Sequence, residues 1–409
     1  MVGREAVIAG ALRTPYGRRE GALGSWHPVD LGAYLLSGAA ARYGLAPGDV
    51  QDVLLGCVSQ VGAQAGNLAR NAVLAAGWPE EVCGATVDGR EASSARAVHW
   101  AVQAVRSGAQ DLVLAGGVEV MSAVPPGAAL AVPNIGKPYS PALRARYDRT
   151  ASLLPPSHAV EEVARRWHLS RQRLDDWSVS SHLRAAVARD QPSQHVLAVP
   201  LGPRRDGGAG ASGESHERRG PEGTPRAGWL AKDEVLGPPL SPEDAAAFAP
   251  LFVEGGVATA ANVAPEGDGA AVLLVASANR ARALKLAPLA RFVSFAVAGT
   301  DPSIWPTATI LATRRALEEA KLCLDDVDYF EVHESSAAAV LAWLDETGAD
   351  PALVNARGGA LARTSPHGAV GAGLFVEAVE ALVQRGQGRA LVSVAGEGGV
   401  ATACVIERS

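Results

Sequence analysis

The sequence has few cysteines, few aromatic residues and no long apolar run, and each shortage excludes a class of protein. Its four cysteines, Cys57, Cys83, Cys323 and Cys404, fit neither a metal-ligand spacing nor a disulfide framework. We therefore expect four reduced, buried cysteines and no metal site. No apolar run approaches about 18 residues, and no charged leader precedes an apolar stretch at the N-terminus. We expect neither a transmembrane helix nor a signal peptide, which favours a cytoplasmic protein.

The content of charged residues is ordinary for a folded protein, and their balance is slightly acidic. Charged residues make up 20% of the chain and the formal net charge is −6, so we expect neither nucleic acid nor a membrane surface as a partner. Hydrophobic residues make up 48%, which is enough for a large core. With aromatic residues at only 5%, small apolar side chains must fill that core, which favours helices packed closely on a sheet.

Short apolar runs alternate with helical patterns through the first third of the chain. The expected strands are 6–9, 53–56, 85–88 and 112–115, and the expected helices are 30–43, 67–76 and 93–107. Strands that alternate with helices indicate an α/β fold with a mostly parallel sheet.

The same order of elements returns near the C-terminus. A helix at 308–320 precedes Asp-Asp-Val-Asp at 325–328, as an earlier helix precedes Gly-Asp-Val-Gln-Asp at 48–52. A helix at 368–384 and a strand at 389–394 then match 93–107 and 111–115, with an offset of roughly 280 residues. This repetition predicts an internally duplicated α/β unit.

A region of different character separates the two copies. It runs from about 124 to 246 and includes helical patterns at 159–167 and 171–189. Its segment 202–228 is rich in Gly, Ser, Arg and Glu, which predicts a mobile surface loop. The expected domains are an N-terminal half (1–123 with 247–276), an inserted loop domain (124–246) and a C-terminal half (277–409).

Several motifs, in order along the chain, resemble those of the thiolase superfamily. They are Gly-Cys-Val-Ser-Gln at 56–60, Gly-Asn-Leu-Ala-Arg at 66–70, Gly-Gly-Val-Glu-Val-Met-Ser at 116–122, Gly-Val-Ala-Thr-Ala-Ala-Asn at 256–262, Asp-Gly-Ala-Ala at 268–271, Asn-Ala-Arg-Gly-Gly-Ala at 355–360 and Gly-Ala-Val-Gly at 368–371. The resemblance implies a thiolase fold, in which two duplicated α/β halves pack face to face beside an inserted loop domain that contacts coenzyme A. It also implies thioester chemistry with no tightly bound cofactor, an acyl-CoA or acyl-carrier thioester as substrate, and a homodimer or tetramer.

The thiolase residues that carry acyl groups and protons are replaced in this chain. Where the family has its nucleophilic cysteine, in an Asn-Arg-x-Cys-Ser-Ser-Gly pattern, this sequence has Glu91, and the nearest cysteine in sequence is Cys83. A carboxylate is a poor acyl carrier because its adduct is a labile anhydride. Glu91 at a helix N-terminus fits a lowered pKa, with either a catalytic role or a simple capping role.

Two further positions have lost their usual chemistry. The Gly-His-Pro triplet of the family is Thr-Ser-Pro at 364–366, so Ser365 replaces the activating histidine and can donate a hydrogen bond but cannot act as a base. His367 follows the proline and is expected to point elsewhere on the turn; the alternative is that it belongs to the oxyanion or pocket region and takes over the role of the missing histidine. The second cysteine corresponds to Ala395, which precedes the Gly-Glu-Gly-Gly turn that contains Glu397 and Gly398, residues that we assign to the oxyanion or pocket region.

One catalytic element is retained, in the run Glu-Val-His-Glu at 331–334. His333 resembles the Asn or His that holds the thioester oxygen in the family; the alternative is a structural histidine at a strand end. The substrate-binding positions differ more. Pro156 lies in the motif that is usually His-Met-Gly, Ala264 replaces a serine after the Asn262 motif, and Trp305 replaces a smaller residue and can fill part of the acyl pocket.

Three functions remain open from the sequence. An altered enzyme would use Glu91, His333 and Ser365 on an acyl thioester, for acyl transfer or carbon–carbon bond chemistry. Decarboxylation of a malonyl thioester is disfavoured because the substrate carboxylate and Glu91 would repel each other unless Arg90 or a proton intervenes. The alternatives are a non-catalytic partner of an active thiolase and a protein that binds an acyl thioester without reacting it. The replacement of the nucleophilic cysteine by Glu91 excludes a thiolase reaction through a cysteine acyl-enzyme.

Overall fold

The fold is taken from a computed structural model, which describes residues 4–134, 136, 138–147, 156–191, 193–201, 228–235 and 239–408. The predicted loop at 202–228 lies almost wholly outside the described residues. The strands are β1 (Ala6–Arg13), β2 (Gly17–Arg18), β3 (Asp52–Gly56), β4 (Cys83–Val87), β5 (Leu112–Val120), β6 (Val199–Pro200), β7 (Trp229–Leu230), β8 (Gly267–Ser277), β9 (Ala290–Gly299), β10 (Tyr329–Val332), β11 (Gly388–Gly396) and β12 (Val400–Arg408).

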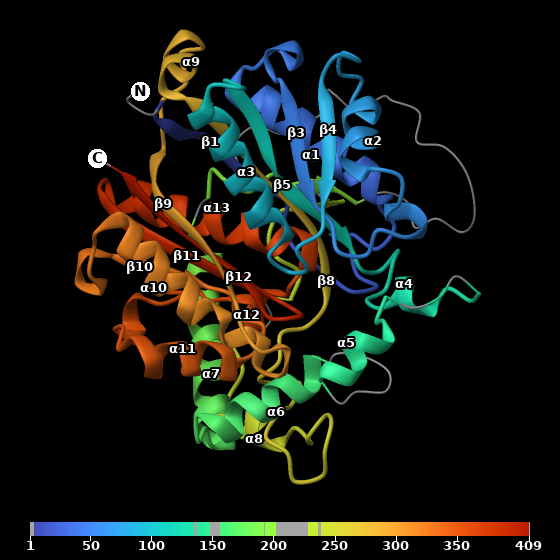
Figure 1. Ribbon diagram of the computed structural model, residues 1–409, viewed down its shortest axis with the longest axis vertical. Coiled ribbons are helices and arrows are strands. Elements are labelled where there is room, and N and C mark those ends of the chain that lie inside the picture. The colour runs from blue at the N-terminus through green and yellow to red at the C-terminus, as the bar shows by residue number, and fades with distance from the viewer. Residues whose placement is uncertain are drawn as a thin grey trace.

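Helices cover and separate these strands (Figure 1). The α-helices are α1 (Pro28–Tyr43), α2 (Leu68–Ala75), α3 (Ser93–Ser107), α4 (Ala128–Ala131), α5 (Pro141–Arg146), α6 (Pro156–Arg166), α7 (Arg171–Arg189), α8 (Pro242–Ala247), α9 (Ala278–Ala283), α10 (Ala308–Ala320), α11 (Ala337–Thr347), α12 (Ala360–Arg363) and α13 (His367–Arg385). Short 3-10 turns are at Pro47–Asp49, Gly62–Gln64, Pro302–Thr307, Leu324–Asp326 and Pro351–Leu353.

The strands of the two halves meet in one continuous sheet. Its order is β10-β11-β12-β9-β1-β8-β5-β3-β4, with β2 paired to β8. The junction is the antiparallel pair β1–β9, where Val7 lies opposite Arg291 and Ile8 opposite Ala290. The pairs β3–β4, β3–β5 and β10–β11 are parallel and the other pairs are antiparallel. The expected α/β fold is confirmed, but the sheet contains more antiparallel pairing than the alternation of helices and strands predicted.

Two helices lie in the middle of the molecule. α3 packs on β3, β5 and β8 of the first half, while α13 packs on α3, on β5 and β8, and on β10 and β11 of the second half. On the outer faces, α1 and α2 cover the first half and α10 covers β9 and β12 of the second (Figure 1). Because α3 and α13 occupy equivalent places in the two halves, the predicted duplication is visible in the packing.

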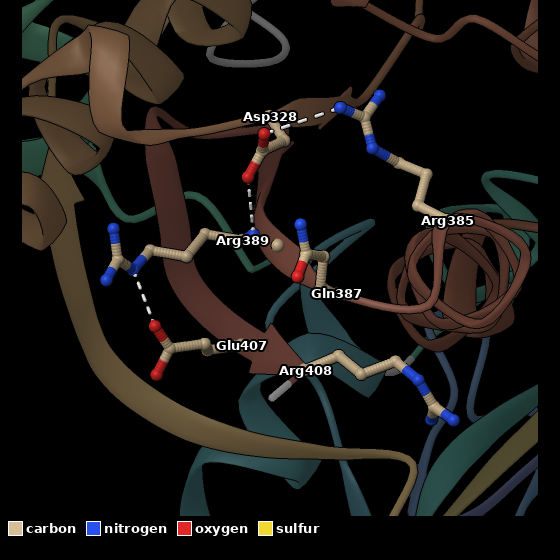
Figure 2. Close-up of a pocket in the computed structure, with 7 residues that line it drawn as sticks. Asp328, Arg385, Gln387, Arg389, Glu407 and Arg408 are labelled. Atoms are coloured by element: carbon tan, nitrogen blue, oxygen red, sulfur yellow. Dashed lines mark hydrogen bonds and ion pairs between the residues drawn. The ribbon is translucent and has the colours of Figure 1, made fainter.

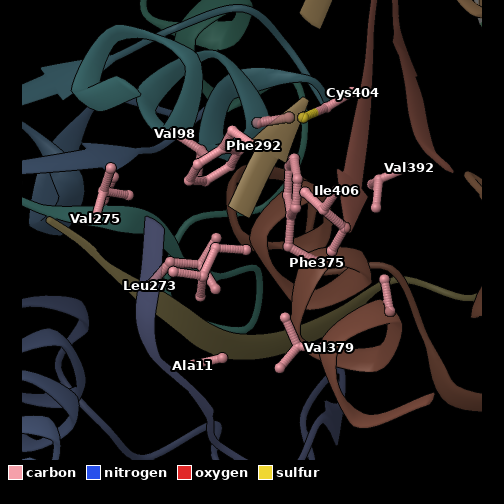
Figure 3. Close-up of a cluster of buried hydrophobic side chains, with 14 of the residues drawn as sticks. Ala11, Val98, Leu273, Val275, Phe292, Phe375, Val379, Val392, Cys404 and Ile406 are labelled. Atoms are coloured by element: carbon pink, nitrogen blue, oxygen red, sulfur yellow. The ribbon is translucent and has the colours of Figure 1, made fainter. Parts of the chain in front are cut away.

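The core between the halves consists of small and medium apolar side chains. Figure 3 shows residues from both halves facing one another around α13, among them Val98, Leu273, Phe375 and Ile406. Phe292 of β9 meets Phe375 of α13 edge to face, with ring centroids 6.3 Å apart. Burial of this cluster is the main force that holds the halves together.

Glycine allows the N-terminal ends of α3 and α13 to approach each other closely. A Cβ on Gly371 would lie 2.9 Å from the Cβ of Ala95, and one on Gly117 would lie 2.0 Å from the carbonyl oxygen of Gly368. At this contact, the Ser94 hydroxyl accepts a 2.9 Å hydrogen bond from the backbone N–H of Ala372. The first turns of the two central helices therefore lie side by side, and the candidate site forms there.

The inserted region supplies α4 to α8; α5 to α8 lie in the lower part of the molecule in Figure 1, and α4 lies above them at the right. α6 and α7 pack on α11 of the second half. The predicted helices at 159–167 and 171–189 correspond to α6 and α7.

The cysteine prediction is half right. All four cysteines are free, and Cys57 and Cys404 are buried, but Cys83 and Cys323 are exposed. Cys83 begins the edge strand β4 and Cys323 precedes a 3-10 turn, so each stands at the rim of an element rather than in its apolar interior. Within the described residues, no helix is both long and apolar enough to cross a membrane.

Candidate functional site

Four chain segments bring the predicted catalytic residues to one edge of the sheet. Glu91 lies in the turn before α3, and His333 follows β10. Ser365 lies just before α13, and Ala395 lies near the end of β11. Hydrogen bonds described below connect these segments, so the residues that were picked from separate motifs form one cluster.

Glu91 is buried and turned toward the C-terminal half. Its Oε2 accepts a 2.7 Å hydrogen bond from the backbone N–H of Glu397, and its Oε1 lies 3.9 Å from Nδ1 of His367. Burial alone would raise the pKa of Glu91, but His367, backbone N–H groups and Arg90 together lower it below its ordinary value. Glu91 is therefore an ionised carboxylate at neutral pH.

His333 is buried and held at both ring nitrogens. Nδ1 lies 3.0 Å from the carbonyl oxygen of Ala395, and Nε2 lies 3.3 Å from Oγ of Ser365. Burial lowers the pKa of His333 to about 4, and the nearby Glu91 carboxylate opposes this only in part. His333 is consequently a neutral imidazole at neutral pH, with a negative charge close by.

The expectation that His367 points away from the site is wrong. His367 is the first residue of α13, and its imidazole lies beside the Glu91 carboxylate. The first turn of a helix that starts immediately after Pro366 directs this side chain toward α3, because the two helix ends are in contact. His367 is thus the residue of this cluster whose placement the motif comparison misjudged.

Ala395 and Trp305 lie in one apolar cluster next to His333. Trp305 is buried among alanines that include Ala395, Ala308 and Ala312, and its indole Nε1 has no hydrogen-bond partner among the described residues. The same apolar cluster therefore contains the Trp305 ring and Ala395, the residue whose carbonyl oxygen holds His333. Trp305 therefore fills space next to the site.

Arg90 and Glu397 form an ion pair across the two halves, adjacent to Glu91. Arg90 has a left-handed backbone with φ of 55°, and the turn after Glu397 continues with Gly398 and Gly399, whose φ angles are 87° and 84°. The pair is partly exposed. It closes the outer side of the turn whose N–H holds the Glu91 carboxylate.

The predicted substrate-binding positions are used within the fold. Asn262 donates to Asp175 at 3.0 Å and to the carbonyl of Val257 at 2.9 Å, so its side chain holds a turn against α7. Ala264 donates its backbone N–H to Ser335 at 3.1 Å. Pro156 begins α6, and its side chain lies outside the described residues. Their contacts with a substrate stay a prediction.

Comparison with known proteins identifies the family. The family model described as "thiolase, N-terminal domain" matches residues 6–279, and the model described as "thiolase, C-terminal domain" matches residues 286–408. The chain belongs to the thiolase family.

Full-length thiolases are similar to this chain. Steroid 3-ketoacyl-CoA thiolase FadA6 of Mycobacterium tuberculosis is 38% identical over 412 residues, which cover 99% of this chain and 94% of the relative. The 3-oxoadipyl-CoA/3-oxo-5,6-dehydrosuberyl-CoA thiolase of Escherichia coli is 33% identical, with 99% and 100% covered. The crystal structure of the Bacillus anthracis acetyl-CoA acetyltransferase matches with a TM-score of 0.85 at 30% identity, and 99% of each chain is covered. The thiolase fold and its superfamily are therefore shown over the whole length.

In this thiolase-family chain, both buried cysteines are protonated thiols at neutral pH. Sγ of Cys57 faces the Glu119 carboxylate at 3.9 Å, and Cys404 lies in the core of Figure 3. Burial raises the pKa of both thiols far above its ordinary value. The other two cysteines are exposed on the rim of the fold.

The sequence comparison missed how Glu334, the neighbour of His333, holds the inserted region. Its carboxylate accepts hydrogen bonds from Trp177 Nε1 at 2.8 Å and Ser181 Oγ at 2.7 Å, both on α7, and from the backbone N–H of Leu361 at 3.1 Å. Trp177 and Ser181 are one helical turn apart, and this spacing was the sequence feature that could have indicated a shared partner. Glu334 is accordingly an anchor for α7 rather than a group that faces Glu91.

A separate hollow of about 580 Å³ lies at the opposite end of the thiolase C-terminal half (Figure 2). It is lined by Asp328, Arg385, Gln387, Gly388, Arg389, Glu407 and Arg408. β11 starts at this hollow and ends at Ala395 and Gly396, so the two places are about 26 Å apart along the strand. Arg385 is paired with Asp328, Arg389 with Glu407, and Arg408 with the carbonyl of Leu289, so each of these three cations already has a partner within the protein.

Proposed function

We propose that this thiolase-family chain acts on an acyl thioester of coenzyme A or a carrier protein, through Glu91 and His333 and without a cysteine nucleophile. The reaction class is acyl transfer or carbon–carbon bond chemistry. Thioester substrates are in keeping with relatives named 3-ketoacyl-CoA thiolase and acetyl-CoA acetyltransferase. The observation that carries the proposal is the buried Glu91 carboxylate, held by the N–H of Glu397 with His333 and His367 close to it.

The charges at the site support different roles for the two residues. The lowered pKa keeps Glu91 ionised, so it stabilises positive charge that develops on a neighbouring imidazole. The lowered pKa of His333 keeps its ring neutral, so one ring nitrogen retains a lone pair that faces the reacting groups. A carboxylate and a neutral imidazole in one buried place form a base with a charge partner.

A second function is favoured by one specific contact. The carboxylate of Glu91 already occupies the N–H of Glu397, a donor that would otherwise be free to bind a thioester oxygen. A chain blocked in this way suits a non-catalytic partner of an active thiolase, or a protein that binds an acyl thioester without reacting it. We place the altered enzyme first because Glu91, His333 and Ser365 form a polar cluster rather than an apolar plug.

The assembly and the domain division belong to the same proposal. We infer a homodimer, a cytoplasmic location, and a division into two thiolase halves (1–123 with 247–276, and 277–409) around an inserted loop domain (124–246). The packing of α6 and α7 on α11 supports the inserted domain as a cover on the second half.

The decisive experiment incubates the full chain with acyl-CoAs of increasing chain length and measures free thiol release and stoichiometric binding. Turnover that falls at least about 100-fold in Glu91→Gln supports the enzyme, because the variant keeps the shape and loses the charge. Glu81→Gln, an exposed carboxylate of the same half, is the matched control and should behave like the wild type. Binding without turnover supports the binding protein, and turnover only with an added active thiolase supports the partner. Unchanged turnover in Glu91→Gln removes Glu91 from the mechanism.

A further inference from the structure

Ser365 and His333 form a hydrogen-bonded pair whose direction follows from its neighbours. The carbonyl oxygen of Ala395 can only accept, so Nδ1 of His333, 3.0 Å away, carries the proton. In the neutral ring Nε2 then has the lone pair, and the Ser365 hydroxyl, 3.3 Å away, donates to it. This is the arrangement of a hydroxyl nucleophile, its base, and a third group that orients the base.

The backbone around Ser365 holds the hydroxyl in place under strain. Thr364, immediately before it, has φ of 113°, in the region that favours glycine, and its own hydroxyl has no partner among the described residues. The N–H of Ser365 donates to the carbonyl of Pro265 at 2.9 Å, and α13 starts two residues later. Strain of this kind is retained where the surrounding structure requires a side chain in one position.

Glu91 completes the charge arrangement. When the serine proton moves to Nε2, His333 becomes positive, and the Glu91 carboxylate stabilises that form by favouring its protonation. His367 opposes it, and burial opposes it more strongly. The Glu91 carboxylate thus offsets part of the free-energy cost of protonating the buried ring.

We propose that Ser365 is the nucleophile of a thioester hydrolase activity, with His333 as its base and Glu91 as the charge partner of the imidazolium. This inference rests on the proposed function, because it takes the same thioester as substrate. It adds an acyl-serine intermediate and a hydrolysed product, which neither a thiolase reaction nor a binding protein forms.

The reaction balances with water as the co-reactant. Oγ of Ser365 bonds to the thioester carbonyl carbon as its proton passes to Nε2 of His333, and the carbon–sulfur bond breaks while that proton goes to the sulfur, releasing the thiol. Water then adds to the acyl-serine ester as its proton passes to Nε2, and Oγ leaves with that proton. The products are a carboxylic acid and a thiol, and nothing is oxidised or reduced.

The test uses the full chain, an acyl-CoA and a fluorophosphonate ester that modifies activated serines. The mass of the quenched protein should increase by one acyl group, and peptide mapping should place this group and the phosphonate on Ser365. Ser365→Ala should abolish both adducts, and His333→Gln, which keeps a donor toward Ala395, should slow them at least about 100-fold. Ser393→Ala is the matched control: its buried hydroxyl bonds only to backbone carbonyls, and its labelling should equal that of the wild type.

The outcomes separate this inference from the proposed function. Thioester turnover that continues at the wild-type rate in Ser365→Ala, or an acyl group mapped to another residue, overturns the serine nucleophile and leaves the proposed function in place. Absence of acyl-CoA turnover and binding, with fluorophosphonate labelling of Ser365, overturns the thioester substrate and supports the activated serine. Absence of both labelling and turnover overturns the nucleophile.

Discussion

The carboxylate of Glu91 reaches across the boundary between the two halves and accepts a 2.7 Å hydrogen bond from the backbone N–H of Glu397, which lies 306 residues later in the chain. A glutamate at the start of a helix ordinarily turns back to that helix, where the exposed N–H groups attract it. Here the first turns of α3 and α13 are in contact, and the turn after β11 lies opposite. The carboxylate that we propose for the reaction centre thus also links the two halves.

This link predicts an acid-sensitive contribution to stability. Because the pKa of Glu91 is lower in the folded than in the unfolded protein, the unfolded state binds more protons as the pH falls below about 4.5, and stability falls with it. We expect Glu91→Gln to lack this contribution, so that its urea midpoint changes less than that of the wild type between about pH 3.5 and 5. The urea midpoint of Glu81→Gln should change with pH as that of the wild type does. If the midpoint of Glu91→Gln also changes with pH as steeply as that of the wild type, the prediction is contradicted.

Helix boundaries were the part of the fold that local sequence determined best. The helix predicted at 93–107 has the same limits in the structure, because Gly108 adopts a left-handed backbone with φ of 81° and ends it. In contrast, β8 and β9 were not predicted, since a short apolar run such as 270–276 fits a buried strand and a buried helix equally well. The pairing of β1 with β9 joins segments far apart in sequence, and no local pattern specifies its register.

The motifs indicated candidate residues for the site, but they did not determine how those residues lie relative to one another. Glu91, His333, Ser365 and Ala395 were chosen because each is expected to replace or retain a thiolase residue, and hydrogen bonds connect the segments that carry them. The direction of His367 depends on how closely α3 and α13 approach, and that distance depends on the contact of Gly371, one turn further along α13, with Ala95 of α3. Tertiary packing of this kind is invisible to a comparison of one motif at a time.

A buried histidine away from the site should destabilise the protein in acid. His99 of α3 packs on Phe295 with ring centroids 5.0 Å apart, and neither ring nitrogen has a partner among the described residues. Burial lowers the pKa of His99 to about 3, so between about pH 6.5 and 3 the unfolded state binds the extra proton and stability falls as the pH falls. For this one group the loss from pH 8 to pH 5 is about 2 kcal/mol.

We therefore expect His99→Leu to flatten the acid side of the stability curve and to stabilise the protein by about 1 kcal/mol at neutral pH, since two unsatisfied nitrogens are removed. Urea unfolding at several pH values measures both effects. His168→Asn, at an exposed position with φ of 53° that asparagine tolerates, is the control and should retain the slope of the wild type. If the stability of His99→Leu depends on pH as steeply as that of the wild type, His99 is not a neutral, buried imidazole in the folded protein.

Glu334 should stabilise the folded protein, although burying its carboxylate costs free energy. Besides the backbone N–H of Leu361 and the Asn355 amide at 3.4 Å, its carboxylate accepts from Trp177 and Ser181. The last two lie on α7, so the carboxylate connects the inserted region to the strand end that carries His333. We expect Glu334→Gln to destabilise the protein by about 1–3 kcal/mol, because the NH₂ group of the glutamine would face one of these hydrogen-bond donors and leave it without an acceptor. The double-mutant cycle with Trp177→Phe, measured by urea unfolding, should give a coupling of about 0.5–3 kcal/mol. Additive effects of the two substitutions would contradict the anchor.

Glu331 should destabilise the protein as the pH rises. Tyr329 donates a 2.6 Å hydrogen bond to its Oε1, while Oε2 has no partner among the described residues. Burial, followed by the charge of Glu377, raises the pKa of Glu331 to about 8, so the folded state holds a proton that the unfolded state releases above about 4.5. Stability from this group is complete below about pH 4.5 and is lost as the pH rises toward 8, by a few kcal/mol.

We expect Glu331→Gln, which cannot ionise, to be more stable than the wild type at about pH 8.5 and similar to it at about pH 5. Thermal unfolding at the two pH values measures the difference. Glu254→Gln, an exposed carboxylate, should follow the wild type at both. An advantage of Glu331→Gln at the lower pH alone would mean that Glu331 is ionised in the folded protein, against the burial of its unpartnered oxygen.

Trp305 should limit the size of the acyl group. Its ring lies in the alanine cluster with Ala395, whose carbonyl holds His333, so shortening the side chain opens space next to the proposed reaction centre. We expect Trp305→Leu to shift the preference among acyl-CoAs toward longer chains by about 10-fold, and to destabilise the protein by about 2–4 kcal/mol through the cavity that it creates. Trp305→Phe removes the unpartnered indole N–H and keeps most of the volume, so it should retain the wild-type preference and lose less stability. Turnover or binding measured across a chain-length series distinguishes the two variants, and an unchanged preference in Trp305→Leu would mean that the acyl group lies on the other side of His333.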